Sequence, residues 1–377
     1  MKADITPTKL EIKSLGYMKP AGTAGQASLD VVIKNDKVTR VKNIAVNSQA
    51  LELKDVLLNF SQRNGQAELA DGTLTNAVVG DNRFDAEFIV DEDDTLRIKA
   101  EGDVFDARPF LNGTDSGDDG GQPISISATA KEMITHERRS VKNVNLYSRV
   151  EADGTLQQLE LDAKAGKGAI YLRYMPDKNG RISAQIEADD AGATLYAFGF
   201  YDTVRGGKII IQADEIADAG KGDLGGKAVL QHFNVVDTPL LAHLLSVMSL
   251  TGVGDLLKNE GIRFAKLETD FKWIRSSDQN LLTFKNGRTS GNALGLTFEG
   301  RIDRKKKDMK INGTIVPVSM VSDIIGSIPL IGEILTAGSG VFAATYEIKG
   351  DTDNPKTSVN PLSVLAPGIL RKIFFED

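Results

Sequence analysis

Apolar residues recur at every second position over most of this chain, and this period constrains the fold more than any other feature. The clearest run places them on both sides of an acidic turn at residues 91–94: Phe84, Ala86, Phe88 and Val90 before it, Leu96, Ile98 and Ala100 after it. Alternation at period two puts the apolar side chains of a strand on one face. The run therefore predicts a β-hairpin with one apolar face and one solvated face.

The same alternation returns in later segments. Its members are Ile170, Leu172 and Tyr174; Ile182, Ala184, Ile186 and Ala188; Ala265, Leu267, Thr269, Phe271 and Trp273; Leu294, Leu296, Phe298 and Ile302; Met309, Ile311 and Ile315; Phe342, Ala344, Tyr346 and Ile348. Strands that are apolar on one face are typical of antiparallel sheets, whereas strands of parallel doubly wound sheets are apolar on both faces. We predict a mainly β protein with an elongated, curved antiparallel sheet of repeated strand groups. The sheet is expected to fold over into a groove.

Short apolar segments follow several predicted strands and are expected to be helices, more of them toward the C-terminus. They cover residues 106–111, 189–198, 237–246 and 316–325. In the third, Asp237 can cap the helix and Pro239 suits its first turn. A strand group followed by a short helix indicates a degenerate internal repeat.

Polar, glycine-containing stretches at residues 112–123 and 219–226 are the predicted linkers. A chain of 377 residues is longer than a typical single domain. We predict three regions: a β-sheet repeat region at 1–113, a second one at 122–219, and a C-terminal region with apolar helices at 227–377.

Composition argues against several classes of function. The net charge is −7, and no basic stripe suited to nucleic acid is present. The basic cluster at 304–307 is expected to be a solvated turn, with contact to anionic lipid headgroups as the alternative. Cysteine is absent and the three histidines are scattered, so neither a metal site nor a cofactor is expected. No GxSxG nucleophile motif occurs, and we expect no enzyme, although a spatial pair of carboxylates that cleaves glycosides stays open.

The N-terminus reads as polar, charged sequence, without the pattern of a signal peptide or a membrane anchor. The apolar patch at 324–335 contains Pro329 and Glu333 and is too short to cross a bilayer as a helix. A role outside the cytoplasm would therefore require an export element that this sequence lacks.

Two sets of apolar residues are candidates for contact with a ligand or a membrane. The residues expected to line the groove are Phe84, Phe88, Leu96, Ile98, Ile170, Leu172, Ile182, Ile186, Leu267, Phe271, Leu296 and Phe298. The residues expected to touch a membrane or a partner from the C-terminal helices are Leu240, Leu244, Ile324, Ile328 and Leu335. Ordinary packing in a β-sandwich core is the alternative for both sets.

Four segments occur in the order found in the C-terminal region of AsmA-like proteins. They are Ala191-Gly-Ala-Thr-Leu-Tyr-Ala-Phe-Gly-Phe-Tyr-Asp-Thr-Val-Arg-Gly-Gly-Lys208, Phe233-Asn-Val-Val-Asp-Thr-Pro-Leu-Leu-Ala-His-Leu-Leu245, Ser327-Ile-Pro-Leu-Ile-Gly332 and Asn360-Pro-Leu-Ser-Val-Leu-Ala-Pro-Gly-Ile-Leu-Arg-Lys-Ile-Phe374. The chain resembles that superfamily, and within it the YhdP-type members, from about residue 131 to its end.

The resemblance implies a periplasmic envelope protein of bacteria with two membranes, attached to the inner membrane through an N-terminal helix that this chain lacks. It implies a folded-over β-sheet with an apolar groove, phospholipid as cargo, and a role in outer-membrane integrity. The expected partners are phospholipid and, at the C-terminal end, a membrane surface or an envelope protein. An envelope scaffold with a sealed core and no bound lipid is the alternative, and an enzyme built on a β-solenoid is a third.

Overall fold

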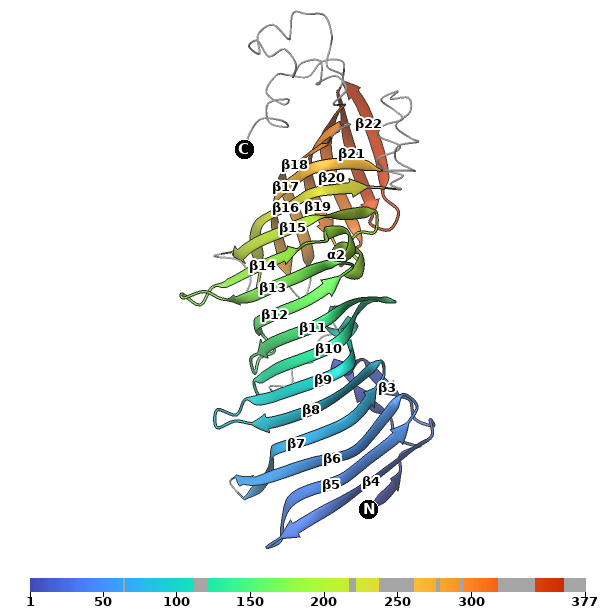
Figure 1. The fold of residues 1–377 in the computed structure, drawn as a ribbon, viewed down its shortest axis with the longest axis vertical. Coiled ribbons are helices and arrows are strands. Elements are labelled where there is room, and N and C mark those ends of the chain that lie inside the picture. Colours follow the sequence, from blue (N-terminus) through green and yellow to red (C-terminus); the bar gives the residue numbers. More distant parts are fainter. Residues whose placement is uncertain are drawn as a thin grey trace, which may run out of the picture. The chain divides into compact units, whose positions relative to one another are not determined.

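The structure is a computed structural model, and it describes residues 1–63, 65–111, 121–216, 222–236, 261–275, 279–291, 294–317 and 343–362. It is mainly β, as predicted: within these segments twenty strands belong to one open sheet, and two short strands form a separate hairpin (Figure 1). The chain divides into two compact units. Unit 1 comprises Met1–Pro176 and Ala197–Phe200, and unit 2 comprises Asp177–Tyr196 and Tyr201–Asp377. The three regions expected from the sequence stay a prediction.

In unit 1 the strands follow one another along the sheet in chain order, after the short edge strand β1. They are β1 (Lys2–Asp4), β4 (Gly25–Lys34), β5 (Lys37–Ser48), β6 (Leu51–Arg63), β7 (Gln66–Val79), β8 (Asn82–Val90), β9 (Leu96–Asp106), β10 (Ile124–His136), β11 (Arg139–Val150), β12 (Leu156–Ala165) and β13 (Gly168–Pro176). The predicted hairpin around the acidic turn is confirmed, because Phe88 pairs with Ile98 and Val90 with Leu96.

One pair in unit 1 departs from the predicted antiparallel pattern. β9 and β10 are parallel, with Ile98 opposite Ile126. A parallel partner must start at the same end as its neighbour, so a two-residue turn cannot join the two strands. The connection instead runs from residue 107 to residue 123 and begins with α1 (Arg108–Leu111). The described part of the linker predicted at 112–123 thus belongs to a crossover between adjacent strands.

Unit 2 is antiparallel at every pairing described between its strands. Its elements are β14 (Ile182–Ala188), α2 (Ala191–Ala197), β15 (Val204–Glu215), β16 (Leu224–Val235), β17 (Ile262–Arg275), β18 (Asn280–Gly291), β19 (Leu294–Asp303), β20 (Asp308–Pro317), β21 (Ala343–Asp351) and β22 (Lys356–Leu362). β16 starts at Leu224, so the end of the linker predicted at 219–226 is strand. The predicted basic turn at 304–307 is confirmed, and the Asp303 carboxylate accepts the amide hydrogens of Lys305 and Lys306.

Two of the four predicted helices are present, as α1 and α2, and both are shorter than expected. Asp190 starts α2 because its carboxylate accepts the amide hydrogen of Ala193 at 3.0 Å. The predicted helix at 237–246 lies outside the described residues. The one predicted at 316–325 was misplaced at its start, because residues 316 and 317 belong to β20. The rest of it lies outside the described residues.

β-Bulges with a left-handed residue recur along the sheet. Asn43, Asp55, Asn76, Asn143 and Asn286 have φ angles of 50°, 52°, 51°, 52° and 53°, and each coincides with a shift of strand register. A bulge adds one residue to one strand and bends it. Cα atoms of β5 and β7 approach within 8 Å, although next-nearest strands of a flat sheet are about 9.6 Å apart. The sheet of unit 1 is therefore sharply bent where these bulges cluster.

Each bulge has the same local sequence: an apolar residue, then Lys or Thr, then Asn or Asp. The dipeptides are Lys-Asn at 42–43, 142–143 and 285–286, Lys-Asp at 54–55, and Thr-Asn at 75–76. Asn and Asp tolerate the left-handed region better than other residues with a side chain. The extra residue also resets the alternation: Val41 and Ile44, three positions apart, pair with Leu58 and Val56, which are two apart. The apolar residues on both sides of the bulge thereby stay on one face.

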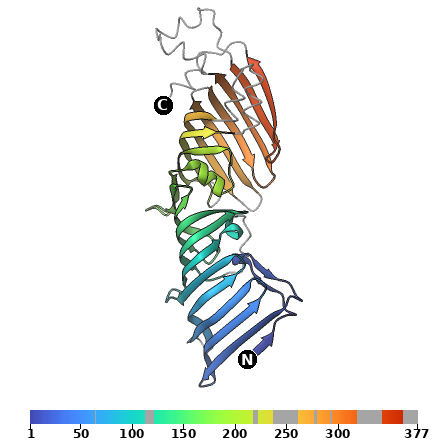
Figure 2. The ribbon, with the colours of Figure 1, turned by 45° about the vertical axis from the view of Figure 1, so that its right-hand side comes forward.

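The first nineteen residues fold against one end of these strands. β2 (Leu10–Ile12), η1 (Lys13–Leu15) and β3 (Tyr17–Lys19) form a small hairpin layer, and Figure 2 shows this dark-blue segment beside the strand ends. Lys19 is 1% exposed, and its ammonium group donates to the carbonyl oxygens of Ile5, Thr6 and Thr8 at 2.9, 3.3 and 2.8 Å. Hydrogen bonds to several oxygens compensate for the burial of this charge.

Candidate functional site

A continuous cross-strand row of mostly apolar side chains crosses unit 1 from β4 to β13. In order of pairing its members are Val31, Val41, Leu58, Gly72, Phe88, Ile98, Ile126, Ser148, Leu159 and Tyr174. Paired residues of neighbouring strands lie side by side on the same face of a sheet. Ser148 and Tyr174 are the members that carry a side-chain hydroxyl, and Tyr174 is otherwise an aromatic ring. We call this the apolar row of unit 1.

The middle of this row is partly open to solvent. Phe88, Ile98, Ile126 and Leu159 are half-buried, whereas Tyr174 is buried and Val31 is 45% exposed. The opposite face has the reverse character, because charged residues such as Glu87 and Lys99 lie opposite each other there and are exposed. Unit 1 therefore has one mainly polar face, which is exposed around Glu87 and Lys99, and one apolar face of intermediate exposure.

The apolar face is covered at one end. Tyr17, Leu51 and Val79 form a buried cluster, and Phe84 packs against it from β8. Phe84 was predicted to line a groove, but it belongs to this closed core. Among the described helices, α1 contacts β10 and η1 contacts β3. The middle of the apolar row, around Phe88 and Ile98, lies beyond the covered end.

The other candidates in unit 1 lie on the same face. Leu96 and Ile98 pair with Ile124 and Ile126, Leu172 pairs with Leu161, and Ile170 pairs with Ala163. Leu96 and Leu172 are half-buried, and Ile170 is 2% exposed. The alternation thus placed these residues on the correct side of the sheet, but their exposure differs from strand to strand.

In unit 2 the apolar face is more deeply buried. One row consists of Ala188, Ile209, Leu230, Leu267, Thr289, Leu296, Ile315 and Ala344. Ile315 and Leu294 of this face have no exposed surface, and Ala344 is 1% exposed. The candidates Ile182, Ile186, Leu267, Phe271, Leu296 and Phe298 all lie on this face; Ile182 is buried and the others are half-buried.

Aromatic rings lie flat on glycines of the next strand in both units. A Cβ atom on Gly72 would come within 2.8 Å of Phe88 Cε2, and one on Gly313 within 2.6 Å of Tyr346 Cζ. A ring can cover the exposed backbone of a strand glycine only where no Cβ intervenes. Each ring therefore covers the backbone of the neighbouring strand at its glycine and projects little above the apolar face.

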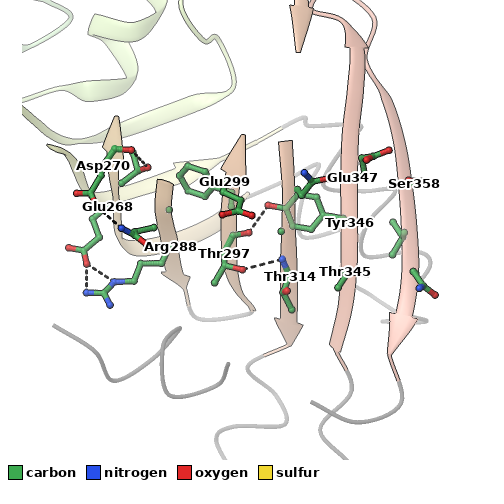
Figure 3. A pocket seen from close by; sticks show the side chains of 18 of the residues that line it. Glu268, Asp270, Arg288, Thr297, Glu299, Thr314, Thr345, Tyr346, Glu347 and Ser358 are labelled. Atoms are coloured by element: carbon green, nitrogen blue, oxygen red, sulfur yellow. Dashed lines mark hydrogen bonds and ion pairs between the residues drawn. The ribbon is translucent and has the colours of Figure 1, made fainter. Parts of the chain in front are cut away.

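A hollow of about 910 Å³ in unit 2 is lined by charged and polar side chains and also by Phe298 and Tyr346, which share the strand face of Leu296 and Ala344 (Figure 3). Its lining includes a cross-strand row in which Glu268 is opposite Arg288, followed by Thr297, Thr314 and Thr345. Glu268 neighbours Leu267 along β17 and so points to the other side of the sheet. A smaller hollow of about 500 Å³ in unit 1 is lined by polar residues such as Asp4 and Asn47 and by apolar ones such as Val46 and Leu53. Of the residues expected to line a groove, Phe298 lines the larger hollow and none lines the smaller one.

Charges in the larger hollow are paired inside the protein. Burial disfavours ionised Glu268, but hydrogen bonds from Lys266 and Arg288 outweigh burial, and the pKa of this carboxyl is lowered. Burial raises the pKa of the Tyr346 phenol far above its usual range, and its hydroxyl donates to the carbonyl oxygen of Thr297 at 2.9 Å. Glu268 is thus an ionised structural group and Tyr346 a neutral one, so neither is poised to exchange protons near neutral pH.

The remaining predictions concern the apolar C-terminal residues, metal sites and membrane-spanning helices. Leu240, Leu244, Ile324, Ile328 and Leu335 lie outside the described residues. In the part of the chain that the structure describes, no group of three or more potential metal ligands occurs. The same described segments contain no helix with the length and apolar character that a membrane span requires.

Sequence reasoning missed two features of these faces. It did not identify the bulges that keep the apolar residues in register, although the recurring Lys-Asn dipeptide was visible. It also missed the larger hollow, because the pairing of Glu268 with Arg288 joins residues of different strands.

Comparisons with known proteins found no relative: no protein-family model, no curated protein and no solved structure matches this chain.

Proposed function

We propose that this chain is a non-enzymatic envelope protein that carries phospholipid along the apolar face of its sheet. It would work in the periplasm between the inner and outer membranes and support outer-membrane integrity, as its likeness to AsmA-like sequences implies. One observation carries the proposal: the apolar row of unit 1 crosses β4 to β13, and its middle is half-buried beyond the end covered by the N-terminal hairpin.

The physical need for such a surface is large. Each methylene group transferred from a membrane into water costs about 0.8 kcal/mol, so a chain of about sixteen carbons faces a penalty of about 13 kcal/mol. A protein face of half-buried Phe, Ile and Leu side chains removes part of this penalty. An acyl chain laid across Phe88, Ile98 and Ile126 would complete the burial of these side chains.

The regularity of the row suits movement of a lipid as well as binding. Neighbouring positions along the row are chemically alike, so a tail that shifts from one strand to the next exchanges one apolar contact for another. The charged residues lie on the opposite face, where Glu87 and Lys99 are exposed. The tail therefore meets no charged side chain along the row and, between β4 and β12, only the hydroxyl of Ser148 as a polar group, so the barrier between adjacent positions is expected to be low.

A sealed scaffold is the second candidate, and the burial of unit 2 favours it. Ile315 and Leu294 have no exposed surface, and eleven of the twelve residues expected to line a groove lie outside both described hollows. A protein whose apolar face is fully buried throughout would bind partner proteins of the envelope and no lipid. The two candidates make opposite predictions for the middle of the apolar row in unit 1.

Site-specific photocrosslinking tests the proposal. Benzoyl-phenylalanine replaces Ile98, or Lys99 as the matched control on the same strand and the opposite face. The purified full chain is irradiated with phospholipid, and lipid adducts are measured by mass spectrometry together with lipid that co-purifies. We expect adducts at position 98 and few at position 99. Equal labelling at both positions without co-purified lipid would overturn the proposal in favour of the sealed scaffold.

A further inference from the structure

The two ends of the strands in unit 1 differ in charge. One edge, rim A, contains the turns at residues 35–36, 91–95 and 151–155, and the other, rim B, contains those at 80–81, 137–138 and 166–167. The turns at 91–95 and 151–155 of rim A carry the carboxylates of Asp91, Glu92, Asp93, Asp94, Glu151 and Asp153. The turns at 80–81, 137–138 and 166–167 of rim B carry Asp81, Glu137, Arg138 and Lys167, and Asp81 is ion-paired with Arg108. The turns of rim A are thus strongly acidic, whereas those of rim B carry as many basic as acidic residues.

The cations on rim B are available to a partner. Arg138 and Lys167 are exposed, and neither forms an ion pair with another described residue. The turns that carry them belong to successive hairpins, because β11 pairs with β12, and they are separated by about 10 Å, or two strand spacings. Lys142 and Lys164 lie directly opposite each other nearby, and Lys142 is also ion-paired with Glu132. Residues 132–142 and 164–167 contain five basic and two acidic residues, so this part of rim B is positively charged in a chain with a net charge of −7.

Exposed apolar side chains lie around the same turn. Phe110 and Leu111 of α1 are 54% and 51% exposed, and Phe200 is 56% exposed. Two contacts tie α1 to the end of β10: the Ala107 amide donates to the Ile134 carbonyl at 2.9 Å, and Arg108 donates to the Glu137 carbonyl at 3.4 Å.

The segment that carries Phe200 is anchored to the same strand end. The Thr135 hydroxyl donates to the carbonyl oxygen of Ala197 at 2.5 Å. Gly199 lies so close to the His136 ring that a Cβ atom on it would be 2.6 Å from the ring. Unit 1 has no other phenylalanine that is more than half exposed, so both of its exposed phenylalanines border the turn at 137–138.

We infer that rim B docks unit 1 onto the surface of an anionic phospholipid bilayer. Basic residues beside an anionic membrane are attracted by its surface potential, and aromatic side chains insert at the level of the headgroups. The acidic rim A is repelled from the same surface, which fixes the orientation of the unit. This docking goes beyond the proposed carriage of lipid and does not require it.

A charge-reversal experiment on the full chain tests this inference. The variant carries Arg138→Glu and Lys167→Glu, and the matched control carries Lys34→Glu and Lys37→Glu, two exposed lysines that flank the rim A turn at 35–36. Both variants change the net charge equally. Binding is measured by sedimentation with vesicles of phosphatidylcholine alone and of an equal mixture with phosphatidylglycerol.

Wild type is expected to bind the mixed vesicles, and more weakly as the salt concentration rises. Each basic residue near an anionic surface strengthens binding about fivefold, so loss of two predicts a decrease of about 30-fold or more for the rim B variant. The control is expected to bind nearly as well as wild type, and a third variant with Phe110→Ser and Phe200→Ser to lose binding without a change of charge.

Unfolding curves and circular dichroism show whether each variant stays folded, which we expect because all the replaced residues are exposed. No binding of folded wild type to mixed vesicles, or equal losses in the rim B and rim A variants, would overturn the inference. Crosslinking at position 98 distinguishes it from the proposed function. A rim B variant that no longer docks but still yields lipid adducts there separates docking from carriage.

Discussion

Units 1 and 2 are built from the same kind of strand but bury their apolar faces to different extents. In unit 1 Phe88, Ile98 and Ile126 are half-buried on the apolar face, and Glu87 and Lys99 are exposed on the opposite face. In unit 2 Ile315 and Leu294 have no exposed surface, and a hollow of about 910 Å³ is lined by both polar and apolar groups. The comparison teaches that period-two alternation determines which face is apolar, whereas bending and covering determine whether that face can receive a ligand.

The largest expected effect comes from the same substitution in the two apolar rows. Ile315→Ala in unit 2 leaves a cavity in a fully buried site and should lower the free energy of unfolding by about 3 to 4 kcal/mol. Ile98→Ala in unit 1 removes a half-buried side chain and should cost about 1 kcal/mol. Urea unfolding of both variants measures the difference. Equal losses would mean that the two faces are buried alike.

A smaller effect is expected where an aromatic ring lies on a glycine. Gly313→Ala in unit 2 and Gly72→Ala in unit 1 each place a methyl group against the ring of Tyr346 or Phe88, and both should cost about 2 to 3 kcal/mol through overpacking. Gly154→Ala is the control, because it has open space and a φ of 79°, and left-handed strain alone costs about 1 to 2 kcal/mol. Thermal unfolding ranks the three. A control as damaging as the other two would show that close packing is not the cause.

The bulge residues should contribute equally to the free energy of unfolding in both units. Asn43 donates to Asp30 and Asn286 donates to Asp270, each at 2.8 Å. Alanine at either position combines a left-handed backbone with loss of this hydrogen bond, and about 1 to 2 kcal/mol is expected. Asn43→Gly and Asn286→Gly remove only the hydrogen bond and should be milder. If glycine lowers the free energy of unfolding as much as alanine does, the backbone conformation is not the reason for Asn at these positions.

The smallest expected effect is a pH dependence confined to the hollow of unit 2. The pKa of Glu268 is lowered in the folded protein relative to the ordinary value of 4.5, so its stabilising contribution is present above that value. The contribution is lost as the pH falls through the lower, folded pKa. Glu268→Gln should therefore flatten the acid side of the stability profile by less than about 1 kcal/mol.

Glu299→Gln is the control for this titration, since Glu299 lines the same hollow, is exposed and forms no ion pair with a described residue. Unfolding is measured at neutral pH and at a pH below 4 for wild type and both variants. An identical acid response of wild type and Glu268→Gln would show that the ion pairs with Lys266 and Arg288 do not stabilise the fold.

The alternation in the sequence predicted the strands well, because the faces of a strand are set by covalent geometry alone. Leu267, Phe271 and Leu296 share one face in the structure, and Phe88 meets Ile98 across the predicted turn. The sequence could not predict that β9 and β10 are parallel, since the direction of the partner depends on where the chain returns after α1.

The sequence by itself determined the strands, their turns and the side of the sheet on which each apolar residue lies, because these follow from the two-residue repeat and the preferences of turn residues. Only the tertiary structure decided that Phe84 is covered by the N-terminal hairpin, that Ile98 is half-buried and that Ile315 is sealed. Exposure depends on bends and covering segments contributed by distant parts of the chain, and no local pattern encodes it. For the same reason the pairing of Glu268 with Arg288, and the meeting of Phe110, Phe200 and Arg138 at one rim, became visible only in three dimensions.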